Sequence, residues 1–336
     1  MPATCLLPTK RLGRCDEPAD ADLHGMAMKR IAAESALYLK LGRGGDWEDN
    51  CISQGTLRFG YKETSHDACK RSDWKSVQQE RESSRGNRSV AKSDVTQIRY
   101  FYESSGKVLW VTFYKHALWW CFAEEEVTLL NDGTKERRAI GGWKQFDRKG
   151  HLLSMSALSG KLLSMQGYKG TICQVKEFPY LRQRLNAEET QEVVQARQSL
   201  EALHTNLEAV IRHLSWKDFE LLIDLIFRQV GWRRVGAIGS TTKSLDLDLL
   251  SPVSAERYGV QVKAKATRKT FERYRDDRLT NMQGFAKCYF VVHTLEDGLA
   301  SVVTGQDDDV RLLLPADVAR LTAVYGLSEW VLDKAG

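Results

Sequence analysis

The stretch SLDLDLLSPVSAERYGVQVKAKA, residues Ser244–Ala266, decides how the second half of the chain is expected to fold. Apolar and polar residues alternate on both sides of a turn signal, a pattern typical of two strands joined as a hairpin. Because successive side chains of a strand point to opposite faces, the leucines and valines share one face of this hairpin. Four polar residues gather on the other face: Asp246, Asp248, Gln261 and Lys263.

The register of the hairpin determines which of these polar side chains meet. With the turn near residues 254 and 255, we predict Asp248 opposite Gln261 and Asp246 opposite Lys263. Carboxylate and amide oxygens, together with a backbone carbonyl, suit Mg²⁺ that keeps part of its water shell. A neighbouring lysine can position or deprotonate an attacking water and stabilise charge on a phosphate. The pattern therefore indicates metal-assisted hydrolysis of a phosphodiester.

The segments around the hairpin predict an α/β domain. The preceding segment, SWKDFELLIDLIFRQVGW, opens with Ser215 as a helix N-cap and stops at Gly231. Its apolar residues recur at helical spacing, as expected for a core-facing helix. They are Trp216, Phe219, Ile223, Ile226, Phe227 and Val230. After the hairpin come a charged segment, the apolar strand CYFVVH and a helix that begins near Pro315, which is an α/β order.

The helix with its FE pair, the aspartate in LDL and the QVK motif together resemble the Mrr-like branch of the PD-(D/E)xK nucleases, whose strand motif is QxK. The glycine-containing loop GAIGSTTKS also stands where this order expects it. The resemblance covers Ser215–His293 and implies a restriction-endonuclease-like α/β domain. It also implies Mg²⁺ as the cofactor, with Mn²⁺ as a substitute.

The same resemblance implies roles for individual residues of this chain. Asp248 becomes the central metal ligand and Asp246 its competitor, because the aspartate of the family stands shortly before the hairpin turn. Gln261 takes the second metal-ligand position, Lys263 is the catalytic lysine, and Glu220 is the acidic catalytic residue of the preceding helix. Alternation on a half-exposed hairpin produces the same motif without any catalytic role, so the order of the surrounding elements is what favours a nuclease.

The segment from Lys263 to Arg278 contains seven basic and three acidic residues, a local net charge of +4. Basic residues beside a cleavage site would bind the phosphate backbone of a nucleic acid, and Lys265, Arg268 and Lys269 are the candidate contacts. The alternative is a solvated helix face on which Arg268 pairs with Glu272.

The first half of the chain predicts a β-rich domain. Between Leu37 and Phe178, short apolar alternations are separated by glycine-containing turns. Expected strands include TLRFGY, KVLWVTFY, LWWCFA, EVTLL and GTICQV, and the polar stretch Lys62–Gln97 is expected to hold one or two amphipathic helices. The pattern LWVTF…LWWCFA…GGW resembles the PUA-like superfamily, which includes the EVE-type and SRA-type readers of modified DNA bases.

Aromatic residues are concentrated in this first half. Proteins hold flipped or modified bases by stacking them between aromatic rings, which makes Trp47, Trp110 and Trp119 the candidate base-pocket residues. Aromatic residues in alternating strands also fill cores and form cross-strand pairs, which is the competing interpretation.

We expect the chain to divide into four segments. They are a disordered extension at 1–27, a PUA-like (EVE-like) reader at 28–178, a helical connector at 179–213 and an Mrr-like nuclease domain at 214–336. A start of translation at Met26 or Met28 is an alternative to the extension.

Composition narrows the class of protein. The chain has 336 residues, 42% hydrophobic and 28% charged, without an apolar run that could span a bilayer, so a membrane protein is not expected. The net charge of +5 permits a polyanionic partner. The seven cysteines are scattered without metal-binding pairs, as expected for reduced thiols in the cytoplasm.

These observations predict an Mg²⁺-dependent endodeoxyribonuclease of the modification-dependent or defence type, a type IV-like restriction enzyme. Its expected partner is double-stranded DNA, with or without modified bases, and cutting both strands favours a homodimer. One alternative is a non-catalytic DNA-binding protein on a nuclease scaffold. Another is a nuclease that acts on RNA or on structured DNA.

Overall fold

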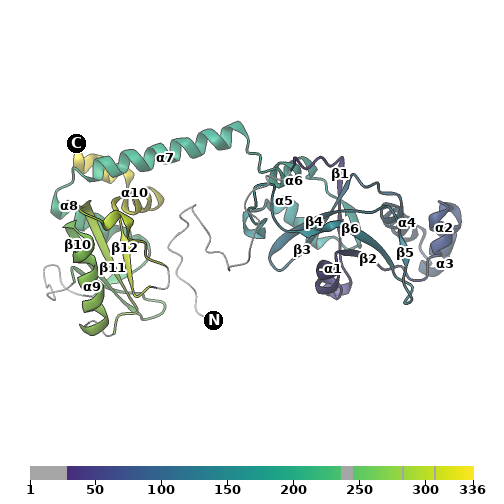
Figure 1. Cartoon of the computed structure of the whole chain (residues 1–336), viewed down its shortest axis with the longest axis horizontal. Helices are drawn as coiled ribbons and strands as arrows, with labels where there is room; N and C mark the ends of the chain where they lie inside the picture. Colours follow the sequence, from purple (N-terminus) through teal and green to yellow (C-terminus); the bar gives the residue numbers. More distant parts are fainter. Residues whose placement is uncertain (1–28, 236–244, 282–283, 306–307) are drawn as a thin grey trace. The chain divides into compact units, whose positions relative to one another are not determined.

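The computed structural model describes residues 29–235, 245–281, 284–305 and 308–336, and these form a mixed α/β protein with two sheets (Figure 1). Two compact units divide between Thr190 and Gln191, and each contains one sheet. The expected extension at 1–27 and the loop GAIGSTTKS at 236–244 lie outside the described residues.

The sheet of the first unit has the order β2-β6-β4-β3-β1-β7, with β5 beside β6. Its strands are β1 (Ser35–Leu39), β2 (Thr56–Phe59), β3 (Val108–Tyr114), β4 (Ala117–Ala123), β5 (Thr128–Leu129), β6 (Lys135–Lys144) and β7 (Ile172–Gln174). The described pairings are antiparallel except for β1 with β3, which is parallel. Each of the five segments expected to form strands in this half overlaps one of these strands.

The helices of the first unit lie mainly in the polar stretch after β2. They are α1 (Glu48–Gln54), α2 (His66–Lys70), α3 (Trp74–Arg85), α4 (Arg88–Glu103), α5 (Gly160–Leu163) and α6 (Phe178–Leu185). Asp73 and Asn87 cap α3 and α4 by accepting backbone N–H groups of the first turn. The prediction of one or two helices between Lys62 and Gln97 is therefore too low, because α2, α3 and the larger part of α4 lie there.

The second unit contains a five-stranded sheet of order β12-β11-β10-β9-β8. Its elements are α7 (Gln191–Ile211), α8 (Trp216–Gln229), β8 (Arg233–Arg234), β9 (Leu247–Leu250), β10 (Arg257–Ala266), α9 (Arg268–Asn281), β11 (Lys287–Leu295), β12 (Val310–Leu313), α10 (Pro315–Val324) and α11 (Ser328–Ala335). Strands β8, β9 and β10 pair antiparallel, whereas β10, β11 and β12 pair parallel. The helix α9 provides the crossover that a parallel pair requires.

The two faces of this sheet carry separate hydrophobic cores. On one face, α8 and α10 pack against strand side chains such as Leu247 and Val260. On the other face, α9 packs Phe271 and Tyr274 against Phe290 of β11. Side chains that alternate along β10 therefore meet two different groups of helices.

The helix α8 begins and ends as expected. The hydroxyl of Ser215 accepts the backbone N–H of Asp218, and Gly231 follows the helix with φ of 91°, in the left-handed region. Of the six residues expected in the core, Trp216 is an exception: it is 39% exposed, because at the first helical position it lies at the edge of the buried stripe, beside Phe219.

The expected helical connector is two helices that belong to different units. Leu181 and Leu185 of α6 pack into a core of the first unit. Leu207 and Ile211 of α7 pack into the core of the second unit. The expected connector at 179–213 therefore consists of two helices: α6 packs within the first unit, and α7 packs Leu207 and Ile211 within the second while its Leu200 and Leu203 stay exposed.

Candidate functional site

The hairpin β9–β10 has a register two residues away from the predicted one. Asp248 lies opposite Gly259, and Leu250 lies opposite Arg257. The turn spans residues 251–256, so its centre lies one residue earlier than expected. A turn displaced by one residue moves every cross-strand partner by two, which makes the predicted pairs wrong.

This register places Asp246, rather than Asp248, beside Gln261. The Gln261 amide donates a hydrogen bond to Asp246 Oδ2, and the backbone N–H of Val262 donates to the same oxygen over 2.6 Å. The ladder of β9 and β10 ends with the pair Leu247 and Val260, so the N–H of Val262 lies beyond it. The Asp246 carboxylate therefore binds at the point where the two strands separate.

A glycine on β10 permits this arrangement. A Cβ atom at Gly259 would lie 2.8 Å from Leu245 Cδ2 and 3.0 Å from the Cys288 sulfur. The first distance is shorter than real Cβ contacts and the second is tighter than most of them, so a larger residue here would displace Leu245, which enters the core beneath α9, or Cys288. The position of Leu245 in turn fixes the neighbouring Asp246.

The second aspartate of the pair has a different partner. The Arg257 guanidinium donates to both oxygens of the Asp248 carboxylate, and the hydrogen bond raises the pKa of Arg257. The same guanidinium lies 5.0 Å from the ring of Phe285. Asp248 is thus part of an ion pair at the end of the hairpin, and it has no described contact with Gln261.

Lys263 lies on the same face of β10 as Gln261, two residues further along the strand. Gln261 is 6% exposed, whereas Lys263 is half-buried beside Val292 of β11. Within the described part of the chain, the Lys263 ammonium has no acidic partner. The structure thus brings a carboxylate and an amide into contact, and Lys263 lies on the same face of β10 as the amide without a described contact to either group.

Glu220 does not join this group through any described contact. It is half-exposed on α8, and the buried side of that helix packs on the opposite face of the sheet. Among the described residues, its carboxylate has no hydrogen bond or ion pair.

Two of the three basic residues expected to contact DNA have acidic partners in the chain. Lys265 lies 3.7 Å from Glu296, and Arg268 forms an ion pair with Glu272 over 2.8 Å. The Arg268–Glu272 pair is the one predicted for a solvated helix face. Lys269 is exposed and has no described ion pair.

The candidate base pocket of three tryptophans is contradicted at Trp110. This side chain is 0% exposed and packs edge-on against Phe101 at 5.9 Å, with the Arg137 guanidinium 5.7 Å from its ring. Strand β3 lies inside the sheet, where hydrophobic cores cover both faces, so its aromatic residues fill the core. Trp110 therefore cannot receive a base.

The other two tryptophans are half-buried. Trp47 lies beneath the guanidinium of Arg58 at 4.8 Å, and the indole N–H of Trp119 donates to the carbonyl of Tyr114 over 3.1 Å. Neither lines the large cavity of the first unit.

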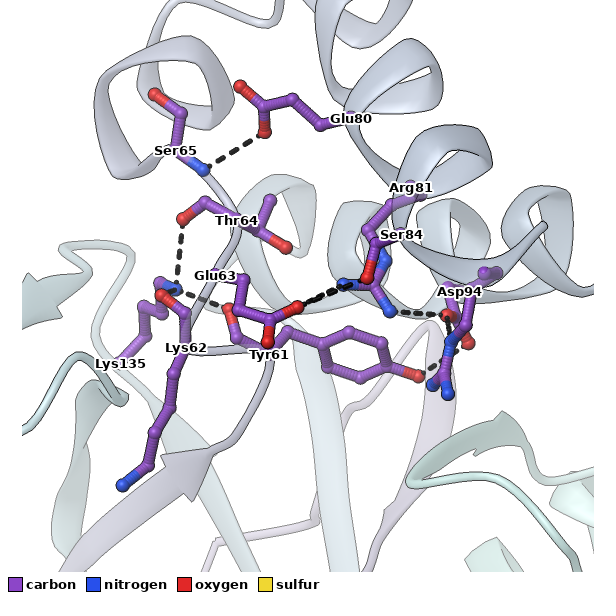
Figure 2. Close-up of polar contacts among 11 residues, drawn as sticks. Tyr61, Lys62, Glu63, Thr64, Ser65, Glu80, Arg81, Ser84, Asp94 and Lys135 are labelled. Carbon is purple, nitrogen blue, oxygen red and sulfur yellow. Dashed lines mark hydrogen bonds and ion pairs between the residues drawn. The ribbon is translucent and has the colours of Figure 1, made fainter.

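That cavity, about 860 Å³ in volume, was not foreseen from the sequence. It is lined by the loop after β2, by α3 and α4, and by residues 168–171. Figure 2 shows its polar wall, where the Asp94 carboxylate accepts hydrogen bonds from Tyr61 (2.9 Å) and Arg81 (2.8 Å). Arg85 donates to the same carboxylate over 2.7 Å. Burial raises the pKa of Asp94, but these three hydrogen bonds outweigh it and hold the pKa below its usual value.

A buried lysine fixes the loop that forms one side of the cavity. Lys135 of β6 is 1% exposed, and its ammonium donates to the carbonyls of Tyr61 (2.6 Å) and Thr64 (3.1 Å), as Figure 2 shows. Burial lowers the pKa of Lys135. The loop needs this support because Tyr61 has φ of 53°, a left-handed conformation that is rare for a bulky residue. The sequence contained one indication of this cavity: the charged residues Arg81 and Asp94 occupy positions on the buried, otherwise mainly apolar sides of α3 and α4.

Comparisons of the chain with protein-family models, with curated proteins and with solved structures find no match. None of the described helices is long and apolar enough to cross a membrane.

Proposed function

We propose that the chain is a metal-dependent endodeoxyribonuclease whose centre consists of Asp246, Gln261 and Lys263. The observation that carries this proposal is the contact between Asp246 and Gln261 where β9 and β10 separate. Lys263 follows on the same face of β10 without a described acidic partner. A structural hairpin would gain nothing from a half-buried ammonium group that has no acidic partner among the described residues and follows a buried amide on the same face.

The residues present fit a hard divalent cation. Asp246 Oδ1 and Gln261 Oε1 have no described hydrogen bond, so both oxygens are available as ligands. Among the described residues, no three His, Cys, Asp or Glu side chains come together as a metal site. Mg²⁺ does not need such a cluster, because it keeps several waters and binds through one or two carboxylates plus phosphates of the substrate. When bound here, the cation would activate water and neutralise charge on the scissile phosphate.

The side chains of the centre have separate tasks in this proposal. The Val262 N–H and the Gln261 amide hold the Asp246 carboxylate in one orientation, so its second oxygen points to a fixed place. The Lys263 ammonium binds a phosphate oxygen of the substrate or takes part in proton transfer from the attacking water.

Double-stranded DNA is the proposed substrate, and restriction of foreign or modified DNA is the proposed role. Cleavage of both strands needs two centres, which a homodimer would supply. Purified full-length protein should cut plasmid DNA with Mg²⁺ or Mn²⁺ and should not cut it in EDTA. Methylated DNA, unmodified DNA and RNA of the same sequence complete the assay. Cleavage of RNA alone would favour the RNA alternative, and no metal-dependent cleavage of any substrate would favour the non-catalytic scaffold.

A change at Gln261 tests metal binding without measuring cleavage. Gln261→Glu places a second carboxyl group against Asp246, which raises the pKa of the new group in the folded state. We therefore expect the free energy of unfolding to fall by about 1–3 kcal/mol at neutral pH. The loss is absent below a pH of about 4.3, where the new carboxyl group is protonated in both the folded and the unfolded state, and it develops as the pH rises through the folded-state pKa. Millimolar Mg²⁺ should reverse this loss in thermal unfolding at pH 7, because the cation offsets the repulsion.

Gln198→Glu is the matched control, because Gln198 is exposed on α7. It should change neither the stability nor its dependence on Mg²⁺. If Gln261→Glu unfolds at the wild-type temperature with and without Mg²⁺, the two side chains do not form a metal site.

A further inference from the structure

The large cavity of the first unit has no part in the proposed cleavage reaction, yet its walls are firmly built. Lys135 holds the loop on one side, as described above. On the other side, Gln97 Oε1 accepts the backbone N–H groups of Thr171 (2.6 Å) and Ile172 (3.0 Å). A Cβ atom at Gly170 would lie 2.7 Å from Gln97 Oε1, so glycine is needed for this close approach. Such fixed walls are typical of a preformed ligand site.

The charges that line the cavity favour an anion. Three cationic side chains, Arg81, Arg85 and Lys169, line the cavity together with two carboxylates, those of Glu63 and Asp94, which leaves a net charge of +1. A fourth, Lys62, also lines the cavity, but its ammonium forms an ion pair with Asp132 over 3.2 Å. The Asp94 carboxylate is 4% exposed and is already shared between two arginines. One carboxylate cannot use all the donors of two guanidinium groups, because each carries five N–H donors.

Arg81 is the buried cation with donors to spare. It is 5% exposed, and its Nη2 donates to Asp94. Its Nε has no described hydrogen-bond partner, and its Nη1 lies 3.9 Å from the Glu63 carboxylate, too far for a hydrogen bond. A buried guanidinium with unsatisfied donors costs free energy that an incoming anion would recover.

Glu63 marks the place where such an anion would bind. Its side chain is 76% exposed, and it accepts a hydrogen bond from the Ser84 hydroxyl over 3.1 Å (Figure 2). A carboxylate held this weakly at the mouth of the cavity can be displaced by a group that reaches the guanidinium more closely.

We propose that this cavity binds a phosphate-bearing ligand of nucleotide size. The phosphate lies against Arg81 and Arg85, replaces the Glu63 carboxylate, and is contacted by Lys169 from the opposite wall. Arginine forks match phosphate oxygens in pairs, and the volume of about 860 Å³ suits a ligand of this size. The Tyr168 ring, on the same wall as Lys169, provides a surface for a planar base. The ligand has two sources with the same chemistry: a free nucleotide, or one nucleotide unit of a DNA strand.

Isothermal titration calorimetry of the full-length protein tests this proposal. The buffer is metal-free, so that the proposed metal-dependent cleavage does not consume the titrant. The titrants are inorganic phosphate, the four deoxynucleoside monophosphates and a short single-stranded oligonucleotide.

Arg85→Gln and Lys169→Gln should each weaken binding by about tenfold through the loss of a charge-assisted hydrogen bond. Glu63→Gln should strengthen it by about threefold through the loss of a weak competing ion pair. Arg88→Gln removes the same charge from a side chain that is 91% exposed and lies outside the cavity, so binding should not change.

The outcomes separate the sources of the ligand and the two proposals for this chain. Binding of a mononucleotide with this pattern of variants identifies a free nucleotide, and the same pattern with the oligonucleotide alone identifies a strand. Either result stands whether or not the protein cuts DNA. Absence of binding by all three titrants overturns the proposal, and so does binding that Arg88→Gln weakens as much as Arg85→Gln does. Thermal unfolding of each variant confirms that its fold is retained.

Discussion

Asp246→Asn is expected to lower metal-dependent DNA cleavage by about 10³-fold while leaving the fold intact. The asparagine oxygen can still accept the N–H of Val262, so the junction of β9 and β10 keeps its hydrogen bond. We expect the change in unfolding free energy to stay below about 1 kcal/mol. The negative charge that would hold the cation is lost. Initial rates on supercoiled plasmid with Mg²⁺, together with circular dichroism and thermal unfolding, measure both quantities.

Asp248→Asn is the matched control for this change. It removes the same charge two residues away and breaks only the ion pair with Arg257. Because both partners of that pair are partly exposed, the cost is below about 1 kcal/mol, and cleavage should stay within about threefold of the wild-type rate. The reverse result, with Asp248→Asn inactive and Asp246→Asn active, would mean that Asp248 is the metal ligand.

Lys263→Met is expected to lower the rate of cleavage by about 10²–10⁴-fold without weakening DNA binding to a similar degree. Methionine keeps most of the apolar stem that packs beside Val292, but it carries no ammonium group for the phosphate or for proton transfer. Single-turnover cleavage measures the chemical step, and fluorescence anisotropy in Ca²⁺ measures binding.

Lys265→Met is the control, because Lys265 is exposed on the same strand and is paired with Glu296. Its cleavage should remain within about threefold of wild type. Full activity in Lys263→Met would remove this residue from the mechanism and leave the hairpin as a structural element.

Local patterns predicted most of the secondary structure correctly. The N-cap at Ser215 and the helical spacing of Phe219 and Ile223 determine α8, because both depend only on neighbouring residues. The alternation in β10 places Gln261 and Lys263 on one face for the same reason. The strand β6 is less easily recognised, since its buried positions include Lys135 and Arg137.

The burial of these two charged residues could not be predicted from the sequence pattern. Arg137 is buried because its guanidinium donates to carbonyls of Phe101, Ser104 and Glu124, which come from other parts of the chain. Lys135 is buried for the same physical reason. A buried charge is tolerated only where distant partners satisfy it, and those partners are known only once the chain has folded.

The sequence by itself determined which residues of the hairpin share a face, because the side-chain period of a strand is a local property. Only the tertiary structure decided which aspartate meets Gln261. That choice depends on where the turn closes and on Leu245 crossing Gly259 into the core beneath α9, a contact between distant elements. Burial of Trp110 was decided in the same way, because its strand acquired neighbours on both edges and cores on both faces.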